Sequence, residues 1–235
     1  MLKRGKMNKI YERTGCNTQE ELIEYIDRLK NNPKIFGKKL TTIKELTKNM
    51  ENVKFLDIGC WLGIFLYHLK KEPQFKCVEG IDIDEDYVKA GREFVYDKIE
   101  CKSLFDMEKQ YDVILMSEVI EHVDNPKKYV QKIYDLVSPG GYFIIITPSA
   151  ISLTNILLNI KHWKNLRYIE KEKRGMGTQT DHYYCWDKLT LFRLCNSVGF
   201  KYNSHNFSNG FRPTKGQSII MVVKKEDKSK EVFLS

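Results

Sequence analysis

Two acidic residues and two glycines form the segment whose residue types and spacing carry the clearest chemistry. Asp57, Gly59 and Gly63 close one short apolar run, and Asp82 closes the next. Glycines at such a turn let the backbone approach a ligand where a Cβ atom would clash. An acid at the end of the second strand can accept hydrogen bonds from both hydroxyls of a ribose. The pattern therefore predicts a site for a nucleoside cofactor.

The spacing of the glycines narrows the kind of cofactor. A dinucleotide site has the pattern G-x-G-x-x-G, which places a pyrophosphate at a helix N-terminus. Here Gly59 and Gly63 are four positions apart, and Asp57 and Asp82 both carry negative charge. Two acids suit a cationic ligand better than a pyrophosphate. S-adenosylmethionine, which carries a sulfonium and an ammonium, meets this requirement.

A second group of reactive side chains lies further along the chain. Glu118, Glu121 and His122 follow another apolar run, and positions i, i+3 and i+4 share one face of a helical turn. We therefore expect two carboxylates and an imidazole to converge beside the cofactor. Such a set can take the proton of a hydroxyl nucleophile or bind Mg²⁺, Mn²⁺ or Zn²⁺. The alternative is a packing role, with His122 an ordinary helix residue beside the cofactor.

Alternating strands and helices are expected to position these residues. Short apolar runs predict strands at 53–58, 77–83, 99–105, 113–117, 142–147, 200–207 and 218–223. Helical spacing predicts helices at 64–69, 85–95, 127–137 and 187–198. Pro139, Gly140 and Gly141 predict a turn. This order is typical of an α/β fold with a doubly wound, mostly parallel sheet, whose ligands bind at the carboxyl ends of the strands.

The chain divides into five predicted parts. They are a basic N-terminal helical extension (1–50), the cofactor-binding half of the core (51–149), a lid insertion (150–185), the C-terminal core elements (186–225) and a disordered tail (226–235). In the extension, irregular residues 1–19 precede helices at 20–29 and 33–46. The lid is amphipathic and basic, with glycines for a hinge. A helix packed on the sheet edge fits the lid pattern equally well.

Charge and cysteine content bound the function further. The net charge is +8, and it is distributed as +6 over residues 1–50, −6 over 51–149 and +8 over the rest. The basic flanks are either solvated surface or a rim for an anionic substrate, nucleic acid or a membrane. The six cysteines form no C-x-x-C pair, which argues against a zinc finger and fits a cytoplasmic protein. We expect no membrane span and no secretory signal.

The segment from Asp57 to Gly63 resembles motif I of class I S-adenosylmethionine-dependent methyltransferases, D/E-x-G-x-G-x-G. The resemblance covers roughly residues 50–225 and is to the groups known as types 11 and 23. It implies a Rossmann-like, seven-stranded sheet with an antiparallel last strand, N-terminal helices and a helical lid. One departure is Trp61, which stands at the middle glycine. It either narrows the methionine end of the pocket or reshapes the loop.

The resemblance implies cofactor-binding roles for ten residues. Four would line the methionine portion: Asp57, Gly59, Cys60 and Gly63. Two would contact the ribose and the adenine, respectively: Asp82 and Ile83. Four would flank the base or close the site under the sulfonium: Ser103, Leu104, Ser117 and Glu118.

The spacing E-x-x-E-H is similar to the metal-binding segment of two methyltransferase groups, one that makes ubiquinone and one that methylates the terminal 2′-hydroxyl of small RNAs. In the RNA enzymes a further histidine precedes an aromatic-rich helix start, and His182 stands at such a place here. The resemblance thus implies a metal site of Glu118, Glu121, His122 and His182. Without a metal, Glu121, His122 and His182 are the candidates for the catalytic base, and a plain lid role for His182 remains an alternative.

Three functions follow from these patterns. The favoured one is O-methylation of a small-molecule hydroxyl on a sugar or glycan, a phenol or quinone, or a lipid-linked precursor. An RNA 2′-O-methyltransferase would use the same four metal ligands, but the chain has no recognisable RNA-binding module and its basic lid lacks interleaved stacking aromatics. A non-catalytic cofactor-binding domain is favoured only by Trp61. A membrane contact through the basic lid is a further expectation, and the sequence does not indicate an oligomeric state.

Overall fold

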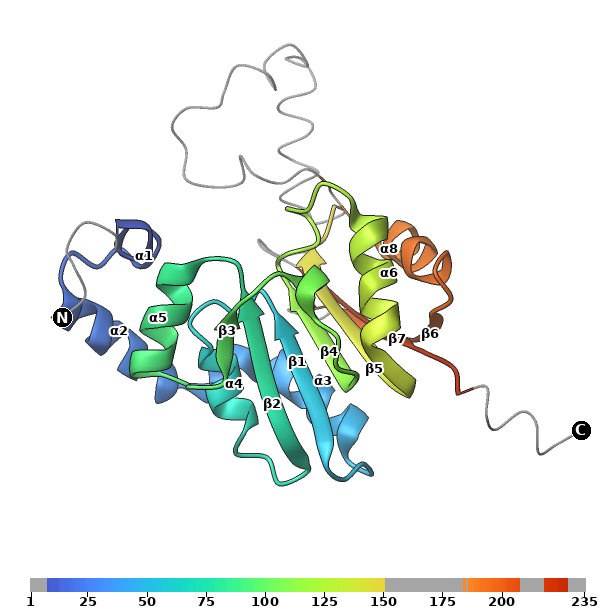
Figure 1. The fold of residues 1–235 in the computed structure, drawn as a ribbon, viewed down its shortest axis with the longest axis horizontal. Helices are drawn as coiled ribbons and strands as arrows, with labels where there is room; N and C mark the ends of the chain where they lie inside the picture. The colour runs from blue at the N-terminus through green and yellow to red at the C-terminus, as the bar shows by residue number, and fades with distance from the viewer. Residues whose placement is uncertain (1–7, 151–183, 185, 208–217, 228–235) are drawn as a thin grey trace, which may run out of the picture.

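The structure, a computed structural model, describes residues 8–150, 184, 186–207 and 218–227. Its centre is a seven-stranded sheet with the strand order β3-β2-β1-β4-β5-β7-β6 (Figure 1). Strands β1 to β5 pair in parallel, whereas β7 is antiparallel to both of its neighbours. The predicted Rossmann-like sheet with an antiparallel last strand is therefore confirmed.

The strands and helices have the following bounds. The strands are β1 (Val53–Ile58), β2 (Phe75–Asp82), β3 (Ile99–Cys101), β4 (Tyr111–Ser117), β5 (Val137–Pro148), β6 (Lys201–Phe207) and β7 (Ser218–Lys224). The helices that precede β1 are α1 (Asn8–Thr14), α2 (Gln19–Lys30), the 3-10 helix η1 (Pro33–Phe36) and α3 (Gly37–Thr47). The later helices are α4 (Ile64–Leu69), α5 (Glu85–Phe94), the 3-10 helix η2 (Leu104–Asp106), α6 (Pro126–Leu136) and α8 (Lys188–Asn196).

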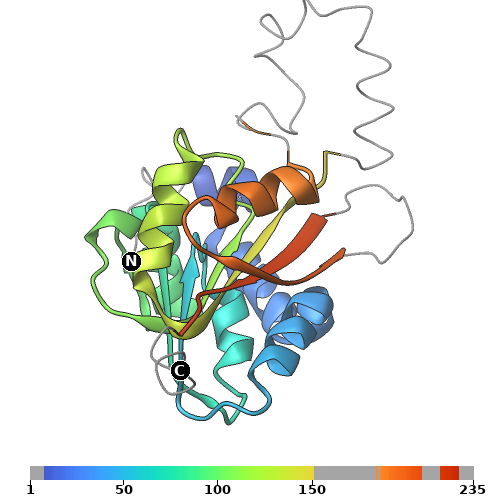
Figure 2. The same cartoon turned by 90° about the vertical axis from the view of Figure 1, so that its right-hand side faces the viewer.

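Each face of the sheet buries its own apolar cluster. Along β1, Leu56 and Ile58 belong to the cluster under α6 and α8, whereas Val53 and Phe55 belong to the cluster under α3 and α4. This alternation follows from the period of two in a strand. Figure 2 shows helices on both faces of the sheet. A parallel sheet covered on both faces explains why its central strands are almost entirely apolar.

Side-chain caps fix where several helices begin. Asp84 accepts hydrogen bonds from the second and third backbone N–H groups of α5, and Asp187 does the same for α8. Asn125 caps α6, which has a proline at its first turn. The cap of α5 places the start of that helix directly after the carboxyl end of β2, where a ligand of this fold binds, whereas residues 118–125 separate β4 from α6.

Three local predictions are wrong. Residues 8–14, expected to be irregular, form helix α1. Pro139 to Gly141 do not form a turn but lie within β5, where the register against β4 shifts and Gly140, at φ +79°, donates its N–H to Lys225. The glycine thus accommodates a bulge in a continuous strand. The third predicted strand ends at Cys101, because the residues after it turn into η2.

The order of the strands reverses between β1 and β4, which is the point where α/β sheets bind ligands. None of the helices in the described part of the chain is long and apolar enough to cross a membrane. The predicted lid, residues 150–185, lies almost wholly outside the described residues. The division of the chain into five parts therefore stays a prediction.

Candidate active site

The turn after β1 brings the backbone close to its neighbours. The N–H groups of Gly59 and Cys60 both donate to the carbonyl of Ile81, at 2.8 and 3.1 Å, which ties the turn to β2. Gly59 has φ +74°, and a Cβ atom there would overlap the side chain of Val119. Glycine is therefore required here, because any side chain would prevent the close approach of this loop to Val119.

Asp82 is held rigidly at the end of β2. Its Oδ2 accepts the N–H of Trp61 at 2.9 Å, and its Oδ1 accepts the N–H of Asp84 at 3.0 Å. Each carboxylate oxygen retains a further lone pair for a ligand hydroxyl. Trp61 has φ +52°, the left-handed region that glycine favours. The loop therefore keeps the backbone conformation of a glycine at this position although the residue is a tryptophan.

A cavity of about 770 Å³ opens at this edge of the sheet. Eight of the predicted site residues line it: Gly59, Asp82, Ile83, Ser103, Leu104, Ser117, Glu118 and His122. Ile83 is 84% exposed, an apolar side chain with one face bare toward this space. The cavity falls in the size range of small-molecule and cofactor sites.

Asp57 directly precedes the cavity-lining Ile58 and Gly59, and it is only 3% exposed. Its Oδ1 has no hydrogen-bond partner within the described residues. Burial raises the pKa of this carboxyl to about 7, against the opposing effect of the Lys39 ammonium. A buried carboxylate oxygen without a partner suits a cationic group of a ligand.

Lys39, on α3, is the cation that faces Asp57 and Glu118. Burial lowers the pKa of its ammonium, and the two carboxylates oppose that shift. The Nζ atom lies 4.2 Å from the centre of the Phe65 ring. The ammonium thus interacts with the carboxylate of Glu118, which lines the cavity, and with that of Asp57, which directly precedes the cavity-lining Ile58.

Glu118, Glu121 and His122 do not share a helical face, contrary to the prediction. Residues 118–122 form a turn, because Glu118 adopts φ +56° and the His122 N–H donates to Val119. Glu118 and His122 consequently line the cavity. Glu121 is 1% exposed and accepts the hydroxyl of Thr147 at 2.9 Å.

The carboxyl of Glu118 accepts the hydroxyl of Ser218 at 3.0 Å. Burial raises the pKa of Glu118 to about 7, and the negative charge of Glu121 adds to this effect. Glu118 therefore keeps its proton to a higher pH than an exposed glutamate does.

A family model described as a methyltransferase domain matches residues 17–205. The chain belongs to this family. Membership of the family implies S-adenosylmethionine as the methyl donor, which is the cofactor predicted from Asp57 and Asp82.

Similar proteins agree with this assignment. The mitochondrial ubiquinone biosynthesis O-methyltransferase of Saccharomyces cerevisiae is 32% identical over 133 residues, which cover 53% of this methyltransferase but 41% of the relative. The ubiquinone biosynthesis O-methyltransferase of Shewanella halifaxensis is 28% identical over 77% of this chain and 80% of the relative. The solved magnesium protoporphyrin IX methyltransferase of Synechocystis, with bound SAH, shares the fold at a TM-score of 0.61 and 13% identity, over 94% of this chain and 93% of that one.

The remaining predicted residues lie as follows in the structure. The side chain of Cys60 packs toward Gly80 in the sheet core, so only its backbone can approach the cofactor. Gly63 begins α4 at φ +73°. The described residues contain no group of three or more His, Cys, Asp or Glu side chains able to hold a metal. His182 lies outside the described residues, so the four-residue metal set stays a prediction.

Several residues of the site were not predicted from the sequence. Lys39 faces Asp57 from the N-terminal extension, and Arg13, Tyr25 and Tyr87 form a further wall of the cavity beside Trp61. No local pattern signals these residues, because they reach the site through contacts between distant segments. The helical spacing of apolar residues in α2 indicates that this helix packs against the rest of the protein, but it does not indicate which residues it contacts.

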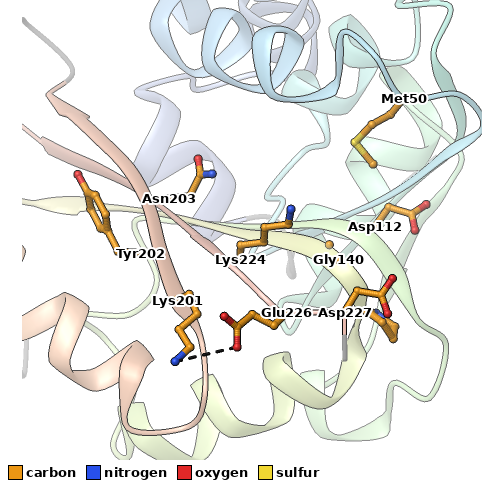
Figure 3. Close-up of a pocket in the computed structure, with 11 residues that line it drawn as sticks. Met50, Asp112, Gly140, Lys201, Tyr202, Asn203, Lys224, Glu226 and Asp227 are labelled. Atoms are coloured by element: carbon orange, nitrogen blue, oxygen red, sulfur yellow. Dashed lines mark ion pairs between the residues drawn. The ribbon is translucent and has the colours of Figure 1, made fainter. Parts of the chain in front are cut away.

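A second hollow, of about 550 Å³, lies at the opposite end of the sheet (Figure 3). It includes Asp112 at the start of β4 and Lys224 at the end of β7. Lys201 and Glu226 form an ion pair there at 4.0 Å. Since cofactors of this fold bind at the carboxyl ends of the parallel strands, this hollow is not the methyl-donor site.

Proposed function

We propose that this methyltransferase methylates a hydroxyl oxygen of a small molecule. The observation that carries the proposal is that His122 lines the same cavity as Asp82 and Gly59. A group able to accept a proton thus faces the space next to the cofactor-binding residues. The names of the similar ubiquinone biosynthesis O-methyltransferases support oxygen as the methylated atom.

The residues present fit S-adenosylmethionine. The unpartnered Oδ1 of Asp57 suits its ammonium, and Lys39 suits its carboxylate. Asp82 suits the ribose hydroxyls, and the bare face of Ile83 suits the adenine. When bound, this cofactor supplies an electrophilic methyl carbon on a positively charged sulfur.

The chain contributes alignment and a proton acceptor. An acceptor held in the cavity is restrained beside the methyl-donor site, which replaces an encounter in solution by a reaction between aligned groups. A bound cofactor would supply the methyl group to the acceptor oxygen, and the imidazole of His122 would take up the hydroxyl proton. Glu118, whose carboxyl lies beside Lys39 and Glu121, completes the polar floor of the site.

Product analysis tests this proposal. The full chain is incubated with S-adenosylmethionine and, separately, with a catechol, a monophenol, a sugar and a short RNA, and the methylated atom is assigned by mass spectrometry and NMR. We expect an O-methyl product on a small acceptor. Transfer confined to nitrogen or to the RNA 2′-hydroxyl would contradict the proposal.

A substitution with a matched control, together with removal of metal ions, tests whether His122 is the proton acceptor. His122→Ala is expected to reduce kcat by roughly 10²- to 10⁴-fold, whereas His205→Ala, on the edge strand β6, should leave kcat within about twofold of the wild type. Unchanged turnover in EDTA is expected for this metal-free mechanism. Turnover that is lost in EDTA and restored by Mg²⁺ would instead support the predicted metal site.

A further inference from the structure

We propose that Trp61 is a positioning residue that fastens helices α1 and α2 over one side of the cofactor cavity, so that cofactor binding and docking of these helices are coupled. The proposal rests on the cofactor site described above. It gives a role to the one residue that departs from the glycine-rich motif.

The backbone of Trp61 is in a conformation that a bulky residue rarely adopts. Its φ of +52° lies in the left-handed region, where a Cβ atom is unfavourable. Such a conformation persists only when the surroundings determine it. Here the Trp61 N–H is fixed by the carboxylate of Asp82, the residue expected to hold the ribose.

The ring of Trp61 joins two helices. It contacts Tyr25 of α2 edge to face, with ring centres 6.3 Å apart and planes at 78°. It contacts Tyr87 of α5 in the same manner, at 6.3 Å and 73°. Edge-to-face aromatic pairs are favourable beyond the area that they bury. One indole therefore links the N-terminal helices to the helix that follows β2.

Helices α1 and α2 are attached through a cluster of their own. Ile10, Leu22 and Ile26 are fully buried against Leu62 and Ile64, next to the cofactor loop. This cluster is distinct from the two that cover the faces of the sheet. Figure 1 shows α1 and α2 beside α5, at the β3 end of the sheet. Because the sheet cores do not depend on them, these helices can undock while the sheet stays folded.

The undocked state would lack one wall of the cofactor cavity. Arg13 of α1 and Tyr25 of α2 line the cavity together with Trp61 and Asp82. Arg13 also lies over the ring of Tyr87, 5.7 Å from its centre. A ligand that contacts this wall binds the docked state better, and by linkage it stabilises docking.

The test combines cofactor affinity with hydrogen exchange, using the full chain and S-adenosylhomocysteine as the probe. In the wild type, we expect the probe to slow amide exchange in residues 10–30. Trp61→Gly restores the family residue and removes both ring contacts. It should bind the probe roughly tenfold more weakly or worse, counting about three- to tenfold for each lost aromatic pair. The slowing of exchange in residues 10–30 should also be lost.

Tyr25→Ala removes the same contact from the α2 side and leaves the cofactor loop intact, so it keeps the test decisive if Trp61→Gly does not fold. We expect it to weaken binding by about three- to tenfold. Trp61→Phe should recover part of the affinity. Tyr202→Ala, an exposed aromatic on β6, is the control and should match the wild type.

Three outcomes separate the coupling from the cofactor site itself. Wild-type affinity in Tyr25→Ala, or probe-dependent protection of residues 10–30 that survives in Trp61→Gly, overturns the coupling alone. Failure of the wild-type chain to bind the probe overturns the cofactor site on which the coupling rests.

Discussion

Replacing Asp57 by asparagine is expected to stabilise the cofactor-free protein while weakening cofactor binding. The carboxyl is 3% exposed, one of its oxygens has no partner within the described residues, and burial raises its pKa to about 7. The folded chain therefore binds this proton more tightly than the unfolded chain does. The stability that the protonated carboxyl provides is complete below pH 4 and is lost as the pH rises through 7.

The size of the effect follows from the pKa. A rise from 3.8 to about 7, at 1.36 kcal/mol per unit, lowers the free energy of unfolding above pH 7 by about 4 kcal/mol. Asparagine is neutral and removes this penalty. The attraction to Lys39 is already contained in the pKa of about 7, so the expected gain at pH 8 is about 4 kcal/mol. For a chain of this length, about 4 kcal/mol raises Tm by roughly 8–16 °C.

The assay is thermal unfolding of the cofactor-free wild type and Asp57→Asn at several pH values from 5 to 8.5. Glu118, whose pKa is also raised to about 7, titrates in both proteins and largely cancels in the difference. Asp106→Asn, an exposed carboxyl on η2, is the matched control. A Tm difference between Asp57→Asn and the wild type that does not grow from pH 5 to 8 would contradict this expectation. A lower Tm for Asp57→Asn than for the wild type at pH 8 would contradict it as well.

Two further substitutions probe the loops around the cavity. Gly59→Ala should lower cofactor affinity at least tenfold and Tm by several degrees, because its Cβ would overlap Val119 at φ +74°; wild-type affinity by calorimetry would show that the loop yields. Thr147→Val should cost about 1–3 kcal/mol, or roughly 2–12 °C in Tm, because the buried Glu121 loses its hydroxyl donor. An unchanged Tm would mean that the buried Glu121 does not need the hydroxyl of Thr147 as a donor.

Much of the core could be predicted from local patterns. The strand over 53–58 and the helix over 64–69 have the predicted bounds, because apolar periodicity and the glycines between them leave few alternatives. The convergence of Asp57 and Asp82 also follows from the sequence. Neighbouring parallel strands present their carboxyl ends at one edge.

The failures have a common physical cause. The turn at 118–122 depends on Glu118 in a left-handed conformation, which the surrounding fold imposes and no local pattern encodes. Lys39 and Tyr25 reach the site by packing between segments that are far apart in the chain. The sequence shows that Trp61 departs from the glycine motif, but only the folded structure shows its two aromatic contacts.

The most direct test of the cofactor site is calorimetric titration of the full chain with S-adenosylmethionine, beside Asp82→Ala. The account predicts one binding site per chain in the wild type. It predicts an affinity lower by roughly 100-fold or more in Asp82→Ala, since the carboxylate would bind two ribose hydroxyls and each such bond is worth about 1.5–3 kcal/mol. No binding by the wild type, or equal binding by both proteins, would contradict it.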